Sequence, residues 1–412
     1  MKSFLSLLGV LLALECSSQA NYQVKLMSWN LLNWPSVTNF ASDTSARCPA
    51  YRAVMDYVMP DILITSENTG TNSTPIFLSQ VMNTGSYHYA AGTFINGYDT
   101  DNSIFFRDSL FQFISNQPIH TSLRDISHFT VVYKATSDTL HIFSAHLKAS
   151  QGYEANRAAE VANLRQVTNA FPPGTNFLLG GDFNFYNDSE PGYIGLLQNN
   201  ISDDGNFLDV LNLTGTWNNS SYAPYHTQST HYSSGGGFAS GGMNDRFDMI
   251  LFSNGIEQPG GAYYVPGTYM NIGNDGNHYN KQINYGTNTA APPVVINGLF
   301  NASDHLPVTI DLRFGPTSGI AEQNEMNAEI EIFPQPVNES TVTRITLNHR
   351  SEISYSIVDV LGQTIFESQA TTLEAGMHYL PVDWNVLTNP GIFFLSIKVD
   401  KYLIGKRVIS LR

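Results

Sequence analysis

Five short segments of the chain carry amides, carboxylates or imidazoles directly after an apolar, strand-like run. They are residues 27–30, 64–68, 144–148, 180–184 and 303–307. Carboxylate and amide oxygens are the ligands that Mg²⁺ and Ca²⁺ require, and imidazoles transfer protons near neutral pH. Ionisable groups beside apolar runs are costly to bury unless they are paired or used. The residue types therefore indicate one polar site suited to metal-assisted acid–base chemistry.

The elements that must position this site are mostly strands. Apolar, β-rich runs occur at residues 23–29, 61–65, 103–106, 130–133, 139–144, 176–180, 247–252 and 306–312, and helical periodicity occurs at 50–59 and 153–169. Polar side chains at strand ends can converge over a rigid apolar platform. An excess of strands over helices predicts sheets packed on each other with helices outside.

The composition predicts an exported protein with two folded units. Of 412 residues, 42% are hydrophobic and 13% are charged, which is ample for two cores. Residues 1–20 are typical of a secretory signal peptide, with an apolar run at 4–14 and small residues up to Ala20. Cys16 is removed with this signal, so Cys48 remains as the one cysteine and no intrachain disulfide is expected. No other apolar stretch approaches the ~20 residues of a transmembrane segment.

The charge and the aperiodic stretches limit the interpretation further. The formal net charge of −15 excludes a basic clamp around a polyanion, but divalent cations held by carboxylates reverse the sign locally. Residues 263–293 are rich in Gly, Asn and Tyr and predict a long solvated loop, in which Asp275 and His278 are expected to be ordinary loop residues. Residues 315–329 predict a linker.

In their order and content, the five segments resemble the signature of the endonuclease/exonuclease/phosphatase superfamily, which includes deoxyribonuclease I, abasic-site endonucleases and bacterial sphingomyelinases. The resemblance covers residues 21–314 and implies a catalytic domain with a four-layer α/β sandwich, in which two facing β-sheets are flanked by helices. It also implies a metal site, with Asn30, Glu67 and Asp304 as ligands of Mg²⁺, or alternatively of Ca²⁺ or Mn²⁺. Ser66 replaces the glutamine that usually precedes this glutamate.

The same resemblance assigns the catalytic groups. Asp182 and Asn184 correspond to the pair that activates the attacking water, with Asn184 also binding a phosphate oxygen. His305 corresponds to the histidine beside the scissile phosphate, and Asp248 to the aspartate that orients it. His146 corresponds to a second histidine, which is found in deoxyribonuclease I and sphingomyelinases where abasic-site endonucleases have tyrosine. These groups imply direct in-line hydrolysis, in which a second imidazole can protonate the leaving oxygen.

Two neighbouring positions are less tightly matched. Lys148, two residues after His146, is expected to contact substrate, and the run that contains it resembles extracellular bacterial nucleases more than sphingomyelinases. Asp125 could orient His146, although a surface turn is the preferred interpretation.

Residues 330–412 form a second set of alternating β runs, which predicts a small immunoglobulin-like β-sandwich. They resemble the type A sorting domain of type IX secretion cargo, with Pro334-Gln335-Pro336 in place of the usual Pro-Asn-Pro. The resemblance implies the type IX secretion machinery as a partner and a location outside the cell or on its surface. A generic binding sandwich is the alternative.

Together these features predict a monomeric, secreted, metal-dependent phosphodiesterase that hydrolyses nucleic acid, with DNA preferred over RNA and endonuclease action over exonuclease action. Because the site defines the bond type better than the leaving group, a sphingomyelinase-like phospholipid phosphodiesterase or a phosphatase is the alternative enzyme. A surface adhesin on a degenerate nuclease fold is the alternative without catalysis. The presence of Glu67, His146, Asp182 and His305 argues against such degeneration.

Overall fold

The computed structural model describes residues 23–35, 44–200, 203–257, 261–315, 328–347, 349–359, 363–400 and 402–411. The predicted signal peptide and most of the predicted linker lie outside these residues. The chain divides into two compact units, residues 1–316 and 317–412, and each is described by itself. None of the helices within the described ranges combines the length and the hydropathy that crossing a membrane requires.

Two mixed β-sheets form the centre of the first unit. One has the strand order β11-β13-β1-β2-β4-β3, with β12 also paired to β13, and the other has the order β5-β6-β7-β8-β10-β9. The strands of the first sheet are β1 (Gln23–Trp34), β2 (Ile62–Asn68), β3 (Tyr89–Ala91), β4 (Asp101–Arg107), β11 (Ala262–Tyr264), β12 (Met270–Asn271) and β13 (Val308–Phe314). Those of the second are β5 (Phe111–Ile119), β6 (Ile126–Tyr133), β7 (Thr139–His146), β8 (Phe177–Asp182), β9 (Phe207–Leu208) and β10 (Asp248–Ser253).

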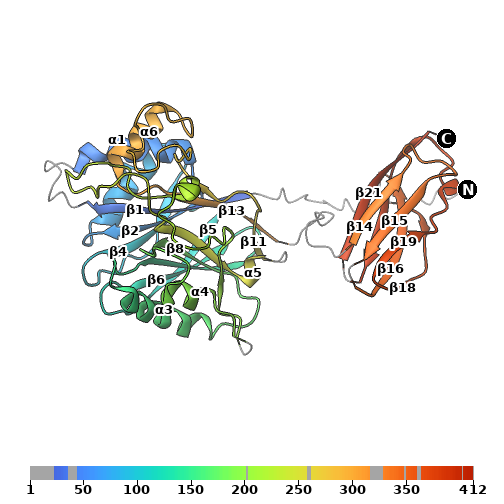
Figure 1. Cartoon of the computed structure of the whole chain (residues 1–412), viewed down its shortest axis with the longest axis horizontal. Helices are drawn as coiled ribbons and strands as arrows, with labels where there is room; N and C mark the ends of the chain where they lie inside the picture. Colours follow the sequence, from blue (N-terminus) through green and yellow to red (C-terminus); the bar gives the residue numbers. More distant parts are fainter. Residues whose placement is uncertain are drawn as a thin grey trace, which may run out of the picture. The chain divides into compact units, whose positions relative to one another are not determined.

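Helices cover the outer faces of both sheets. Helices α1 (Thr44–Val58) and α6 (Pro293–Ala302) lie on one side of the paired sheets, and α3 (Glu154–Thr168) and α4 (Pro191–Leu197) lie on the other (Figure 1). Helix α2 (Ser73–Gln80) joins the first layer through Phe77, and α5 (Asn254–Glu257) is a single turn after β10. The apolar faces that meet between the sheets include Leu26, Ile64, Ile104, Ile142, Leu178 and Ile250. The predicted four-layer α/β sandwich is therefore confirmed.

Residues 263–293 differ from the prediction of a solvated loop. Ile272, Ile283 and Ala291 are buried in the same core as helices α1 and α6. His278 is also buried and Asp275 is partly buried, and their side chains form an ion pair of 2.8 Å between Nδ1 and Oδ1. The prediction was wrong because apolar residues at irregular spacing can anchor a segment that has no period of its own.

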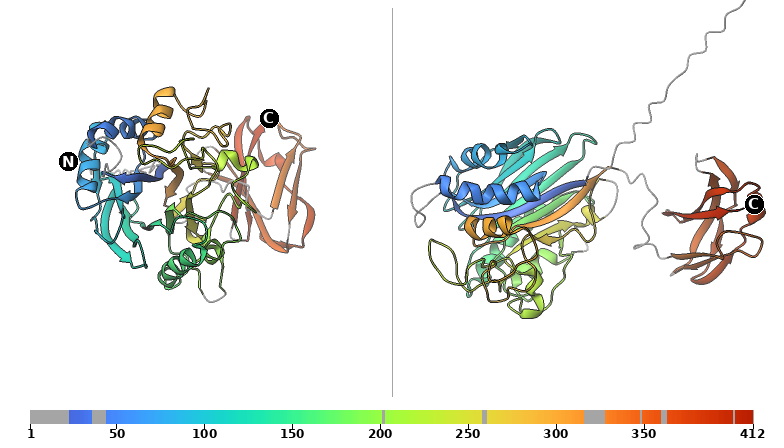
Figure 2. Two further views of the ribbon diagram at one scale, coloured as in Figure 1. Left: turned by 60° about the vertical axis from the view of Figure 1, so that its left-hand side comes forward. Right: turned by 90° about the horizontal axis from the view of Figure 1, so that it is seen from above.

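The second unit contains only β-sheets in its described residues, apart from one 3₁₀ turn at Trp384–Val386 (Figure 2). One sheet contains β14 (Ala328–Phe333), β15 (Val342–Leu347) and β19 (Gly376–Leu380). The other contains β16 (Ser351–Asp359), β17 (Thr364–Glu367), β18 (Thr371–Leu373), β20 (Gly391–Val399) and β21 (Tyr402–Ser410). Ile345 of the first sheet and Leu395 of the second share one core, as expected for a sandwich.

Candidate metal and phosphoester site

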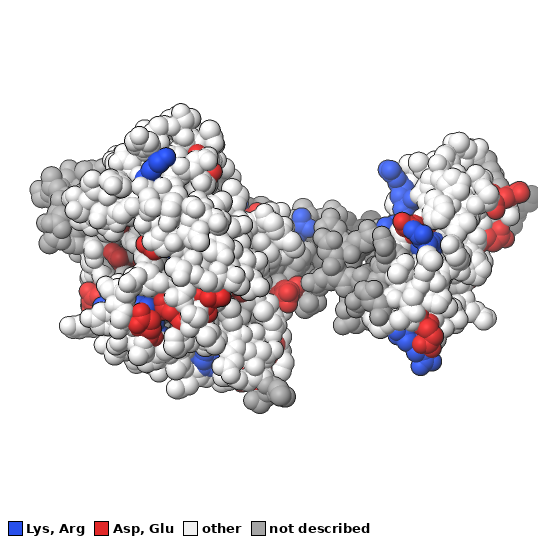
Figure 3. Space-filling view, viewed as in Figure 1, with Lys and Arg blue, Asp and Glu red and all other residues white. Residues whose placement is uncertain are grey.

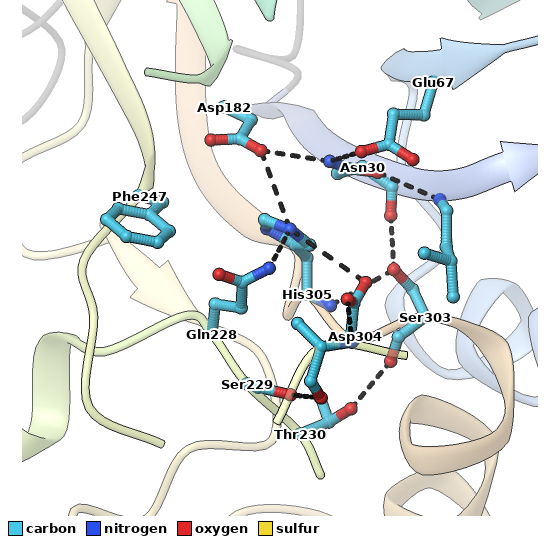
Figure 4. A network of polar contacts seen from close by, with 12 residues as sticks. Asn30, Glu67, Asp182, Gln228, Ser229, Thr230, Phe247, Ser303, Asp304 and His305 are labelled. Atoms are coloured by element: carbon cyan, nitrogen blue, oxygen red, sulfur yellow. Dashed lines mark hydrogen bonds and ion pairs between the residues drawn. The ribbon is translucent and has the colours of Figure 1, made fainter. Parts of the chain in front are cut away.

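Strand direction brings the predicted residues to one edge of the two facing sheets. β1 runs parallel to β2, and β7 runs parallel to β8, so the ends of these four strands carry Asn30, Glu67, His146 and Asp182 to the same edge. β10 is antiparallel to β8, and its first residue, Asp248, pairs with Asp182. β13 is antiparallel to β1, so residues 303–307, which precede β13 in the chain, also lie at this edge. Figure 4 shows the part of this network around Asn30, Glu67, Asp182 and His305.

Asn30 holds the two carboxylates of the cluster side by side. Its Nδ2 donates hydrogen bonds to Glu67 Oε1 at 2.9 Å and to Asp182 Oδ2 at 3.1 Å (Figure 4). Its Oδ1 accepts from Leu32 N at 2.9 Å. In this arrangement Asn30 orients the carboxylates through its amide nitrogen, and its role as a metal ligand stays a prediction.

A bulge in β1 supplies a further contact to Glu67. The register with β2 shifts between Asn30 and Trp34, and Leu32 and Asn33 have φ values of 48° and 51°. Asn33 N donates to Glu67 Oε2 at 2.8 Å. Glu67 itself has a φ of 58°, a region that is costly for a long side chain and that persists only where the surroundings impose it. Strained backbone therefore occurs at the proposed metal site, as it also does elsewhere in the chain, for example at Met59 and Ser137.

The residues present suit a divalent cation. One ligand atom from each of Glu67, His146 and Asp182 lies within 4.8 Å of the others. Burial raises the pKa of Glu67, and the nearby carboxylate of Asp304 raises it further. Burial also raises the pKa of Asp182 to about 7, although His305 opposes this rise. A bound Mg²⁺ or Ca²⁺ would offset the cost of ionising these buried carboxylates, and carboxylate oxygens are the ligands that both ions prefer.

Asp304 lies beside this cluster rather than within it. Its Oδ2 accepts a hydrogen bond from Ala239 N at 2.7 Å, and its Oδ1 lies 4.0 Å from His305 Nε2. Oδ1 is buried and has no hydrogen-bond partner among the described residues. Such an orphaned carboxylate oxygen is available for a cation or for a water bound to one.

His305 is fixed by a buried carboxylate. Its Nδ1 lies 2.7 Å from Asp248 Oδ2, and its Nε2 lies 3.6 Å from Asp182 Oδ2. Burial by itself would lower the pKa of His305, but Asp248 and Asp182 raise it well above its usual value. The imidazole is therefore held as a cation near neutral pH, with Nε2 directed into the site.

His146 has the opposite electrostatic environment. Its Nε2 lies 3.6 Å from Asp182 Oδ2, and its Nδ1 lies 3.9 Å from Glu67 Oε1. Burial lowers its pKa well below the usual value, and the positive charges of Arg124 and His305 add to this effect. The two imidazoles thus approach Asp182 with different protonation states, which separates their chemical roles.

Asn184 fixes the second oxygen of Asp182. Its backbone N and its Nδ2 lie 3.2 and 2.8 Å from Asp182 Oδ1. The φ of Asn184 is 53°, a left-handed conformation that asparagine tolerates better than most residues. One oxygen of Asp182 is therefore held by Asn184, and the other faces the two imidazoles.

Two residues considered from the sequence lie outside this network. Asp125 Oδ2 pairs with His120 Nδ1 at 2.9 Å, so Asp125 belongs to a turn and does not orient His146. Lys148 Nζ lies 4.1 Å above the centre of the Tyr153 ring and donates to Ala149 O at 3.3 Å. Lys148 therefore flanks His146 with its ammonium group over the Tyr153 ring.

Two further residues that shape the site were not predicted. Gln228 Nε2 lies 2.6 Å from His305 Nε2 (Figure 4). Buried Arg47 donates to Leu31 O at 2.6 Å, to Leu32 O at 2.9 Å and to Ala302 O at 2.6 Å, which ties the end of β1 to the residue before Ser303. Neither has a local sequence signal, because Gln228 lies in a polar aromatic stretch and Arg47 precedes the helical periodicity at 50–59.

Comparisons with known proteins agree with this architecture. A family model described as the Endonuclease/Exonuclease/phosphatase family matches residues 27–305, and one described as a secretion system C-terminal sorting domain matches residues 331–410. No curated protein matches the chain.

Solved structures similar to this chain come from several organisms. Truncated TDP2 from Caenorhabditis elegans is 18% identical, with 71% of this chain and 98% of that chain covered and a TM-score of 0.46. The human Nocturnin catalytic domain with bound sulfate is 18% identical, with coverages of 71% and 94% and a TM-score of 0.45. A mannosyl-6-phosphatase from Bacteroides thetaiotaomicron is 18% identical, with coverages of 71% and 100% and a TM-score of 0.45.

Proposed function

Because the chain belongs to the Endonuclease/Exonuclease/phosphatase family, we propose that it is a divalent-metal-dependent phosphodiesterase that hydrolyses nucleic acid, with DNA preferred and endonuclease action expected. Members of this family are hydrolases that act on phosphoester bonds. One observation carries the proposal: the Glu67, His146 and Asp182 group lies directly beside the Asp248–His305 pair. We assign catalysis to residues 21–314 of a monomeric protein.

The proposed mechanism divides the work among the residues of this edge. A bound divalent cation, held by Glu67 and Asp304, would neutralise charge on the phosphate. Asp182, with a pKa of about 7, accepts the proton of the attacking water while Asn184 holds its other oxygen.

The two imidazoles take unequal parts in this mechanism. The carboxylate of Asp248 favours the protonated form of His305, so His305 is the better placed of the two to donate to the phosphoryl group or to the leaving oxygen. A protonated Nε2 cannot face an N–H of Gln228 2.6 Å away, so the amide of Gln228 turns when His305 carries this proton. His146, whose pKa is lowered, is neutral near pH 7 and acts as an acceptor. This assignment differs from the sequence-based expectation that the second imidazole, His146, supplies the proton.

Plasmid cleavage tests the proposal. The purified protein with Mg²⁺ or Ca²⁺ should nick supercoiled plasmid and lose this activity in a chelator. His146→Ala and His305→Ala should each reduce turnover while the circular dichroism spectrum remains that of the folded protein. Activity that is indifferent to chelator would contradict the metal, and activity confined to sphingomyelin would contradict nucleic acid as the substrate.

The surface charge favours a second candidate substrate class. On the face shown in Figure 3, the described part of the first unit has scattered acidic side chains and no continuous band of Lys and Arg. Long nucleic acids gain most of their affinity from such bands. A small phosphomonoester or a phospholipid headgroup does not need one, so phosphatase activity on sugar phosphates and release of phosphocholine belong in the same assay series.

The second unit supplies export rather than chemistry. Residues 331–410 match a C-terminal sorting domain of type IX secretion, which indicates export to the cell surface or the medium. We propose that residues 1–20 direct the chain across the inner membrane and that residues 315–329 link the two units.

A further inference from the structure

We propose that Gln228 is a substrate-contacting residue whose side-chain amide donates a hydrogen bond to the phosphoryl oxygen that also contacts His305 Nε2. This inference rests on the proposed function, and it assigns a second donor to the phosphate position. The observation behind it is the separation of 2.6 Å between Gln228 Nε2 and His305 Nε2 (Figure 4).

The backbone of Gln228 dictates where its side chain lies. Gln228 forms antiparallel bridges with Asp245 on one side and with His305 on the other. Gln228 N donates to Asp245 O at 3.1 Å, and Asp245 N donates to Gln228 O at 2.9 Å. Because residues directly opposite in an antiparallel pair direct their side chains to the same face, Gln228 and His305 must lie next to each other at the site.

The neighbouring residue connects this bridge to the catalytic aspartate. Thr227 Oγ1 accepts hydrogen bonds from Phe247 N at 3.2 Å and from Asp248 N at 3.0 Å. Thr227 O accepts from Leu306 N at 2.7 Å. The segment that carries Gln228 is therefore fixed to both residues of the Asp248–His305 pair, which is the kind of support that a substrate contact requires.

The segment 263–293 is hydrogen-bonded to the residues on either side of Gln228. Ile283 N donates to Thr230 O at 3.0 Å, and Met243 N donates to Lys281 O at 2.9 Å. Asn274 Nδ2 donates to His226 O at 2.8 Å. The buried part of 263–293 thus holds residues 226–243 in place, so that Gln228 is presented at a defined position.

The amide of Gln228 lies where a phosphoryl oxygen would contact His305. Asp248 holds Nδ1 of His305, so Nε2 is the ring atom left to face the phosphate. Gln228 Nε2 lies 2.6 Å from that Nε2, so a phosphoryl oxygen that hydrogen-bonds to the ring at roughly 3 Å displaces the amide and stays within its reach. Gln228 is partly exposed, and its amide can turn from the ring toward an arriving oxygen. An amide offers two N–H donors there without adding a charge.

Variants at Gln228 test the contact in the full-length protein. Gln228→Leu keeps the size and removes the donor, Gln228→Glu adds a negative charge that faces the phosphate, and Gln228→Asn keeps the amide on a shorter chain. We expect Gln228→Leu to lower kcat/KM by roughly 10- to 100-fold, the effect of one hydrogen bond to a charged group. Gln228→Glu should lose more, and Gln228→Asn should recover part of the activity. Gln282→Leu, in the supporting segment, is the matched control and should stay within about two-fold.

Inhibition by inorganic phosphate distinguishes a direct contact between Gln228 and the phosphate from a purely structural role of Gln228. In Gln228→Leu the inhibition constant for phosphate should rise by at least several-fold, with an unchanged thermal midpoint. An unchanged inhibition constant together with kcat/KM near wild type would overturn the inference, even if the wild type is an active phosphodiesterase. If Gln228→Leu does not fold, the comparison of Gln228→Asn with Gln228→Glu decides, and equal activity of these two would also overturn it. A wild-type protein that is inactive on plasmid, RNA, phospholipid and sugar phosphates would instead refute the proposed function.

Discussion

Replacing Asp248 by asparagine should separate catalysis from folding in this site. The carboxylate lies 2.7 Å from His305 Nδ1, and both side chains are almost fully buried. The change removes a charge-assisted hydrogen bond worth about 1.5–3 kcal/mol and also loosens control of the imidazole tautomer. We expect kcat/KM to fall by roughly 10²- to 10⁴-fold. Since His305 can release its proton instead of remaining an unpaired buried cation, stability should fall by no more than about 2 kcal/mol.

A double-mutant cycle provides the assay that can refute this reasoning. Activity on plasmid and on a chromogenic aryl phosphodiester is measured for Asp248→Asn, His305→Ala and the double variant, together with urea unfolding. If Asp248 acts through His305, the second change should cost little once the first is present. Additive losses would show that Asp248 acts independently of the ring. Asp311→Asn, which loses the 2.8 Å contact with Lys25, is the control for removing a carboxylate elsewhere.

Three further predictions concern the metal, the scaffold and pH. Glu67→Gln should abolish the rise in thermal midpoint that Mg²⁺ gives the wild type, because it removes a ligand charge; an equal rise in both proteins would contradict the proposed ligand. Arg47→Lys should lower the free energy of unfolding in urea by about 2–4 kcal/mol, because Lys cannot satisfy the carbonyls of β1 and Ala302 together; a change below about 0.5 kcal/mol would contradict this role. Burial, and then His141, lower the pKa of His128 from 6.5 to about 4. The unfolded chain therefore takes up this proton first, and stability that is full above pH 6.5 should fall by up to about 3 kcal/mol as the pH drops through 4. Thermal scans of His128→Gln should show a shallower dependence, and parallel profiles would refute the assignment.

Much of the fold was predictable because many of its strands appear in the sequence as apolar runs. The runs at 23–29, 61–65 and 139–144 carry apolar residues at the spacing of a strand, and each begins within one residue of the start of an observed strand. Helix α6 (Pro293–Ala302) was missed although its buried Val295, Ile296, Leu299 and Ala302 follow helical spacing and proline is common in the first turn of a helix. Strand β5 (Phe111–Ile119) was missed because Asn116 and Pro118 interrupt its pattern at the edge of the sheet.

The site was predictable as a set of segments and less so as contacts. The sequence placed Glu67, His146, Asp182 and His305 at strand ends, and parallel pairing brought these ends together. It did not indicate that Asn30 would direct its amide nitrogen to the carboxylates, nor that Asp304 would bond Ala239 N. Those orientations depend on a bulge in β1 and on the backbone of residues 229–242, which have no local signature.

By itself, the sequence determined the phosphoester-hydrolase family of this protein and the order of the elements that carry its site, since both follow from residue types and apolar runs. Only the tertiary structure decided which oxygen each carboxylate presents, which charges surround each imidazole, and that Gln228 lies against His305. The physical reason is that burial and through-space charges set protonation, and that backbone pairing between distant segments sets side-chain direction. Neither quantity is a property of any single stretch of sequence.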